Sequence, residues 1–294
     1  MILYLYVYYI IKKIIMVRRA IHSFYSKSYN ELELFMHSCY FILSCLCANK
    51  SGIIMDMYTD DNFKEFIDIA PYENIKTLEN DYEDTYLFPS YSKVKALENE
   101  PLGTVHIDNT IMIKNNILRY DFELSDYDCL IYNKYNDIKL DQWILNASNI
   151  LCTIAYNPWM SRDIEMLYDT SILAFNNKRL FDDWHDSYLY MLDNIKNQNL
   201  IFDNHSKPDE IINNHSLTSI CKFNRYSVKT IYNEDAMDPK IGDRIECFKN
   251  LKYNLPKCLL LIKLMDKRIY QKLIDKWYNK YSEFFNIDIQ KVII

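Results

Sequence analysis

The chain has 294 residues, of which 49% are hydrophobic and 25% are charged, and its formal net charge is −6. This composition excludes an intrinsically disordered chain, because about half of the residues are available to build the core of one large domain or two small ones. The negative net charge excludes a general attraction to polyanions, so binding to RNA or DNA would need a local basic patch. Eight cysteines occur without a C-x-x-C pair, which argues against a zinc ribbon or a thioredoxin-like site. The abundance of Tyr, Ile, Asn and Lys indicates an A/T-rich genome, such as that of a virus or a plasmid.

Residues 1–54 are predicted to be an apolar leader or upstream extension, with buried helices as the alternative. The run 2–15 is interrupted by Lys12 and Lys13, so it is shorter than the roughly 20 apolar residues that cross a bilayer as a helix, and no stable membrane span is expected. A second apolar block, at residues 36–48, has the composition of the hydrophobic part of a signal peptide. We expect an intracellular protein, with secretion through residues 36–48 as the alternative.

The middle of the chain is predicted to hold the sheet. After an acidic entry segment with a short helical stripe at Phe63, Phe66 and Ile67, apolar residues alternate over 105–113 and again over 118–124. The two alternating runs flank Lys114-Asn115-Asn116, which predicts a β-hairpin. We expect an antiparallel sheet centred on residues 104–142.

The C-terminal part is predicted to be mostly helical. The segment 180–195 carries apolar residues at helical spacing, namely Phe181, Trp184, Tyr188, Met191 and Ile195. Other predicted helices cover 143–155 and 162–176 and begin at Asn254, with a polar loop at 197–216 and a strand at 220–231. The fold class is therefore predicted to be α+β, with a single globular domain over residues 55–294 and mostly C-terminal helices.

One short motif carries candidate chemistry. Asp126 and Asp128 alternate immediately before the apolar run 129–132, which places two carboxylates on one face of a strand. Residues 124–132 resemble the D-x-D strand of the nucleotidyltransferase superfamily. That resemblance implies that Asp126 and Asp128 are metal ligands for Mg²⁺ or Mn²⁺ in phosphoryl transfer, with a nucleotide, RNA or DNA as partner. The Gly-Ser motif of that family would fall near Lys114-Asn115 and is missing, so a degenerate relative and a simple polar turn remain alternatives.

Several other polar groupings are weaker candidates. Asp128 with Asp141 resembles the acidic pair of restriction-type nucleases, but the lysine expected after Asp141 is missing. A helical turn that is rich in Asp around His185 could hold a metal or form a solvated face; its members are Asp182, Asp183, His185 and Asp186. His205 and His215 could act in acid–base chemistry or be ordinary polar residues.

A basic stripe recurs every four residues near the C-terminus, at Arg268, Lys272, Lys276 and Lys280, and an apolar face that includes Trp277 lies opposite it. Either this is a packed helix with a solvated lysine face, or it contacts a nucleic-acid backbone.

Three function classes remain open on the sequence. The first is a nucleotidyltransferase-like protein, active or degenerate, that acts on or binds nucleotides or nucleic acid. The second is a non-catalytic, viral-type interaction protein, and the third is a secreted toxin or effector. A third carboxylate beside Asp126 and Asp128 would favour the first class, and a processed N-terminus near residue 48 would favour the third.

Overall fold

The computed structural model describes residues 19–79, 87–113, 126–135, 166–197, 208–231, 245–247 and 251–286. Its centre is a seven-stranded sheet with the strand order β3-β2-β1-β4-β7-β6-β8. The strands are β1 (Arg19–Phe24), β2 (Ile54–Thr59), β3 (Asn74–Thr77), β4 (Val105–Ile107), β6 (Cys129–Tyr135), β7 (Leu167–Phe175) and β8 (Val228–Thr230).

The sheet is mostly parallel. β1 pairs in parallel with β2 and with β4, and β2 pairs in parallel with β3. β7 is antiparallel to both of its neighbours, β4 and β6, and β6 is parallel to β8. Six strands therefore run one way and β7 runs the other way. The architecture is a mixed α/β one, which is compatible with the predicted α+β class. Within residues 104–142, β4 and β6 each pair antiparallel with β7, but the sheet as a whole is mostly parallel, so the prediction of a wholly antiparallel sheet is wrong.

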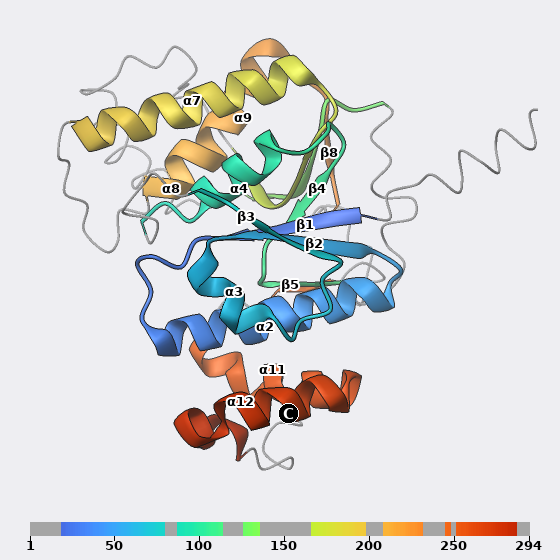
Figure 1. Ribbon diagram of the computed structural model, residues 1–294. Coiled ribbons are helices and arrows are strands. Elements are labelled where there is room, and N and C mark those ends of the chain that lie inside the picture. The colour runs from blue at the N-terminus through green and yellow to red at the C-terminus, as the bar shows by residue number, and fades with distance from the viewer. Residues whose placement is uncertain are drawn as a thin grey trace, which may run out of the picture.

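Helices cover both faces of the sheet, as a mostly parallel sheet requires. One face carries α4 (Ser90–Glu98), α7 (Lys178–Asn197) and α9 (Ser216–Asn224), together with the short helix α8 (Pro208–Glu210) and the π-helix η1 (Ile211–His215). The other face carries α2 (Glu31–Lys50) and α3 (Asp61–Ile67), and α11 (Leu251–Met265) and α12 (Lys267–Phe285) lie beyond α2 (Figure 1).

The N-terminal segment is part of this domain. Asn30 caps α2 through a capping box with Glu33, and the helix interior is buried from Ser38 to Ala48. α2 is the one helix in the described residues that is long and apolar enough to cross a membrane, and 72% of that window is buried inside the protein. Of the two alternatives for residues 1–54, residues 31–50 form the buried helix. A leader that ends at residue 54 is wrong for residues 19–54, because β1 is a central strand of the sheet.

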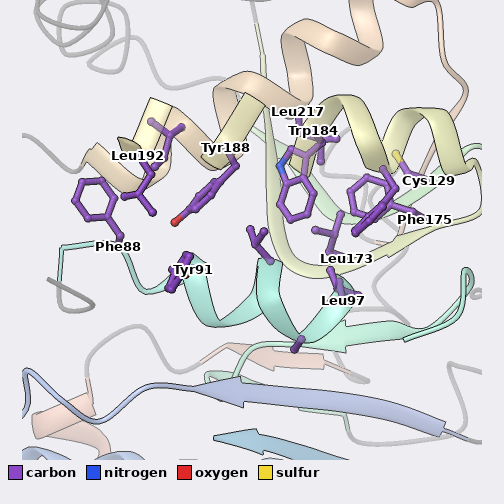
Figure 2. Close-up of a cluster of buried hydrophobic side chains, with 14 of the residues drawn as sticks. Phe88, Tyr91, Leu97, Cys129, Leu173, Phe175, Trp184, Tyr188, Leu192 and Leu217 are labelled. Carbon is purple, nitrogen blue, oxygen red and sulfur yellow. The ribbon is translucent and has the colours of Figure 1, made fainter. Parts of the chain in front are cut away.

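The face that carries α7 has a large aromatic core (Figure 2). Trp184 and Tyr188 of α7 are fully buried, and Trp184 lies 5.0 Å from Phe175 of β7 between ring centroids. Tyr91 and Leu97 of α4 close the cluster from the other side (Figure 2). The predicted helix at 180–195 is confirmed, because its apolar stripe is the side that packs here.

The alternating run at 105–113 is not one strand. β4 ends at Ile107, and β5 (Ile111–Ile113) belongs to a separate two-stranded sheet with β9 (Ile245–Cys247). The turn between them is closed by the Ile111 amide, which donates to the Asp108 carbonyl at 3.0 Å. The second arm of the predicted hairpin, 118–124, lies outside the described residues.

Other predicted elements are corrected as follows. The described part of the predicted helix 162–176 forms strand β7 instead. Residues 208–215 are helical rather than loop, and the predicted strand at 220–231 is the end of α9 followed by β8. The predicted long helix is divided at Asp266, whose carboxylate caps α12. The predicted helix at 143–155 lies outside the described residues.

Candidate functional site

The strand order locates the candidate site. In the order of the sequence, β2 and β3 are added on one side of β1, and β4 then pairs with the other side of β1. In open α/β sheets, ligands bind outside the carboxyl ends of the strands at the point where the strand order reverses. Here that point is the carboxyl end of β1 and β4, and we call the polar side chains that contact one another there the switch-point cluster: Ser23, Ser90, Ser92, Lys93, His106, Asp108, Asp169, Thr170, Asp209, Asn213 and Asn214.

Asp108 is a partly accessible acid of this cluster, and it pairs with a buried lysine. It directly follows β4, and 33% of its side chain is exposed, whereas Lys93 of α4 is only 4% exposed. The Lys93 Nζ lies 3.1 Å from Asp108 Oδ1 and donates to the Thr170 carbonyl at 2.8 Å. A buried ammonium is stable only when it is paired and hydrogen-bonded, and these two partners satisfy that need.

His106 approaches the same carboxylate from within β4. Its Nε2 is 2.7 Å from Ser23 Oγ, and its Nδ1 is 3.5 Å from Asp108 Oδ1 but makes no hydrogen bond with any described residue. Burial lowers the pKa of His106 well below its ordinary value, and the positive charge of Lys93 lowers it further. The imidazole is therefore neutral at neutral pH.

The π-helix η1 supplies amide groups to the cluster. The Asn213 Nδ2 donates to Thr170 Oγ1 at 2.8 Å and to Ser90 Oγ at 2.7 Å, and Thr170 Oγ1 donates to Asn214 Oδ1 at 2.8 Å. Among the described residues, the Asn213 Oδ1 is buried without a partner. π-helical turns of this kind are frequent at functional sites, and this one brings two amides to the edge of the sheet.

Two further acids, Asp169 and Asp209, add negative charge to the cluster beside Asp108. Burial raises the pKa of Asp108 above its ordinary value; Lys93 opposes that shift, and the negative charge of Asp169 adds to it. Asp209 accepts hydrogen bonds from the Ser90 hydroxyl at 2.7 Å and the Tyr188 hydroxyl at 2.8 Å. Burial raises the pKa of Asp209 to about 6. The cluster thus combines one cation with three acids, two of which hold protons more tightly than usual.

The residue after Asp108 contacts an aromatic group. Asn109, the next residue, donates its amide to His37 of α2 at 3.1 Å. The His37 ring lies 4.8 Å from Phe24 and 5.0 Å from Tyr29 between centroids. Burial lowers the pKa of His37 to about 4, so this aromatic group is neutral. Asp108 is therefore followed directly in the chain by a residue that contacts an aromatic group formed by Phe24, Tyr29 and His37.

The predicted metal ligands lie at the other edge of the sheet. Asp126 is exposed, and Asp128 precedes β6, whose amino end is far along the strand from the edge where Asp108 follows β4. The Asp128 carboxylate accepts from the Ser227 amide at 2.7 Å and from the Asn177 side chain at 2.8 Å. Burial raises its pKa, but these hydrogen bonds outweigh burial and lower it overall. The arrangement ties β6 to the start of β8 and to the turn before α7, as the polar-turn alternative describes.

The remaining candidates do not assemble either. His185 lies 3.0 Å from Asp186, and Asp182 pairs with Lys178. His215 is buried in η1; His205 and Asp141 lie outside the described residues. Within the described ranges, no three His, Cys, Asp or Glu side chains form a metal-binding group.

The basic stripe is largely engaged within the protein. Lys276 pairs with Asp68 at 2.9 Å, and Lys280 pairs with Glu31. Arg268 lies 3.6 Å from Asp266, and Lys272 is exposed. Trp277 stacks on Phe66 at 4.9 Å, so α12 packs through its apolar face, as the first alternative for this helix predicts.

No protein family and no curated protein matches the chain. Among solved structures, it is similar to galactosyltransferase LgtC in complex with donor and acceptor sugar analogues, with 10% identity over 79% of this chain and 87% of that one and a TM-score of 0.42. It is also similar to mouse xyloside xylosyltransferase 1, with 12% identity over 74% of this chain and 85% of that one and a TM-score of 0.39. A third is 4-diphosphocytidyl-2C-methyl-D-erythritol synthase from Anaerococcus prevotii, with 12% identity over 74% of this chain and 89% of that one and a TM-score of 0.36.

The predicted nucleotidyltransferase acting on nucleic acid is wrong. Asp126 and Asp128 lie at the amino end of β6, away from the carboxyl ends of the strands where ligands bind in open α/β sheets, and the Asp128 carboxylate is occupied by Ser227 and Asn177. Sequence reasoning missed Asp108 because it lies inside an alternating run whose pattern predicts one strand. The signal was present: Asp108, Asn109 and Thr110 interrupt that run with three polar residues.

Proposed function

We propose that this protein is a glycosyltransferase that binds a nucleotide-sugar donor at the switch-point cluster. The single observation that carries the proposal is the position of Asp108. Its carboxylate is partly exposed at the point of strand reversal, while Lys93 and His106 around it are almost fully buried. A mostly parallel sheet binds nucleotides at this point.

The chemistry of the cluster favours a ligand with many hydroxyl groups. Its side chains are mainly carboxylates, which accept hydrogen bonds, and amides and hydroxyls, which both donate and accept them. The buried Asn213 Oδ1 and His106 Nδ1 have no hydrogen-bond partner among the described residues, and buried polar atoms in that state require an explanation. A sugar hydroxyl is one group that can satisfy both an acceptor and a donor.

Other nucleotide ligands fit less well. Dinucleotide-binding sheets and P-loops need a glycine-rich turn, so that the backbone can approach the phosphates. This chain has three glycines, and β1 is followed by Tyr25 and Ser26 rather than by glycine. The turn after β1 therefore lacks the phosphate-cradling loop of those two classes, and the donor would be held by side chains.

In the proposed reaction, the bond between the anomeric carbon and the diphosphate oxygen breaks, and the nucleoside diphosphate leaves with the electron pair. The acceptor hydroxyl oxygen forms the new bond to the anomeric carbon, and its proton passes to solvent. Asp108 accepts hydrogen bonds from the donor, and the half-buried Asp169 adds a second carboxylate on the same side of the sheet. Positioning of this kind supplies a large share of a barrier reduction.

The test is release of nucleoside diphosphate from a panel of nucleotide sugars: the UDP and GDP derivatives of common hexoses and pentoses. Wild type should release the nucleotide from at least one member, and Asp108→Asn should slow release by about 100-fold or more. Asp128→Asn is the matched control, because it removes a carboxylate at the other edge of the sheet and should retain activity. Equal loss in both variants, or no release from any donor together with no donor binding, would contradict the proposal.

A further inference from the structure

A nucleoside diphosphate is usually held through a divalent cation that one or two carboxylates share with the phosphates. Asp108 is the partly exposed carboxylate at the carboxyl end of β4, so it is where such a cation would bind if the proposed function is correct. Asp108 is already engaged, however. The Lys93 Nζ lies 3.1 Å from its Oδ1 and 3.4 Å from its Oδ2.

The geometry leaves a cation little room. Mg²⁺ sits about 2.1 Å from a carboxylate oxygen, so a Mg²⁺ on Asp108 Oδ1 would lie within about 5 Å of the Lys93 ammonium. Two cations at that distance repel strongly inside a protein, where screening by water and salt is weak.

Lys93 cannot move aside at low cost. Its side chain is 4% exposed, and its Nζ also contacts the Thr170 carbonyl at 2.8 Å and the Thr170 Oγ1 at 3.4 Å. Leaving these partners would bury an unpaired charge. The Lys93 ammonium also stabilises the Asp108 carboxylate, so the ion pair is favoured over a state in which the two side chains are separated.

The donor set is also too small. Asp108 feels the negative charge of Asp169, yet these two acids and His106 do not form a three-ligand group in the described part of the chain. Both Mg²⁺ and Mn²⁺ bind best where oxygen ligands converge. The residues present therefore do not fit a resident divalent cation.

We infer that this site binds its nucleotide without a divalent cation, with the Lys93 ammonium occupying the place beside Asp108 that a metal would take. The inference rests on the proposed function for the identity of the ligand, but the exclusion of metal by Lys93 can be measured without any nucleotide.

The experiment has two arms. The first titrates Mn²⁺ alone into the full chain and follows its electron paramagnetic resonance signal in wild type, Lys93→Met, Lys93→Arg and Lys95→Met. Lys93→Met frees Asp108 from the ammonium and should bind Mn²⁺ about tenfold more tightly than wild type or more. Lys93→Arg keeps the charge and should not gain affinity. Lys95, on the same helix and paired with Glu98, provides the control that should behave like wild type.

The second arm measures UDP, GDP and CDP binding by calorimetry, once with EDTA and once with Mn²⁺. We expect the same affinity within about twofold in both conditions. Nucleotide binding that requires Mn²⁺, or tight Mn²⁺ binding by wild type that Asp108→Asn abolishes, would overturn the inference and leave the proposed function standing. If no nucleotide binds under either condition, the proposed function fails, and the Mn²⁺ titration still decides whether Lys93 excludes the metal. If Lys93→Met does not fold, the wild-type titration against Asp108→Asn gives the same decision.

Discussion

Replacement of Asp209 by asparagine tests the electrostatics of the switch-point cluster. Asp209 accepts hydrogen bonds from the amide and hydroxyl of Ser90, at the start of α4, and from the Tyr188 hydroxyl. Burial raises its pKa from the ordinary 3.8 to about 6. The folded protein therefore binds a proton at Asp209 more tightly than the unfolded chain does.

The sign of the effect follows from this difference. The stability contributed by the bound proton is fully present below about pH 4, falls as the pH rises to about 6 and is absent above that. A shift of about two pH units at 1.36 kcal/mol per unit corresponds to about 3 kcal/mol as an upper limit. The asparagine side chain in Asp209→Asn carries no ionisable group but keeps an acceptor oxygen for Ser90, so the variant should lose this dependence on pH.

Urea unfolding of both proteins at pH 4, 5, 6 and 7 measures the difference directly, because other titrating groups cancel between them. The free energy of unfolding of Asp209→Asn relative to wild type should rise by about 1 to 3 kcal/mol from pH 4 to pH 7. Asp209→Ala, which removes the acceptor, should be destabilised by about 1 to 3 kcal/mol at neutral pH. A difference that is flat with pH, or that falls as the pH rises, would refute the raised pKa of Asp209 in the folded protein.

Three further outcomes follow from the fold. Deletion of residues 1–54 should abolish cooperative urea unfolding, because it removes β1 and α2; a soluble, cooperatively unfolding truncation would contradict their place in the core. Trp184→Ala should cost about 3 to 5 kcal/mol in the free energy of unfolding, whereas Trp277→Ala, at a half-buried position, should cost about 1 to 3 kcal/mol; equal costs would refute the burial difference. Asp128→Asn should lower stability by about 1 kcal/mol through its bonds to Ser227, and Mn²⁺ should not shift the Tm of either protein; a Mn²⁺ shift that the variant loses would restore the metal hypothesis.

The sequence correctly predicts the helices that bury one face and expose the other. Phe181, Trp184 and Tyr188 of α7 and Phe63 and Phe66 of α3 mark helices by their spacing, because one face is buried and the other is polar. Strands that are buried on both faces show no alternation of polar and apolar residues. β7 ends in a continuous apolar run, and the sequence pattern around it predicts a helix instead. Helix α2 is buried almost all round, and for that reason its sequence has the composition of a signal or membrane segment.

The candidate site could not be predicted because it is assembled across the chain. Ser23, Lys93, His106, Thr170 and Asn213 come from five different elements, and parallel strands acquire their neighbours through crossovers that local periodicity does not encode. Only Asp108 leaves a local signal, as a polar break between two apolar stretches. Asp128, in contrast, lies two residues after another aspartate and just before a strand, which predicts a metal ligand. In the structure its carboxylate instead accepts hydrogen bonds from Ser227 and Asn177.

Hydrogen–deuterium exchange with mass spectrometry, with and without a nucleotide sugar that the release assay identifies, tests the central claim most directly. The proposed function predicts slower exchange in peptides that cover the turns after β1 and β4, residues 25–30 and 108–110, where the donor would bind. It predicts no change at residues 126–128 and 226–227, at the opposite edge of the sheet. Protection at the opposite edge with none after β4 would contradict the assignment of the switch-point cluster as the donor site.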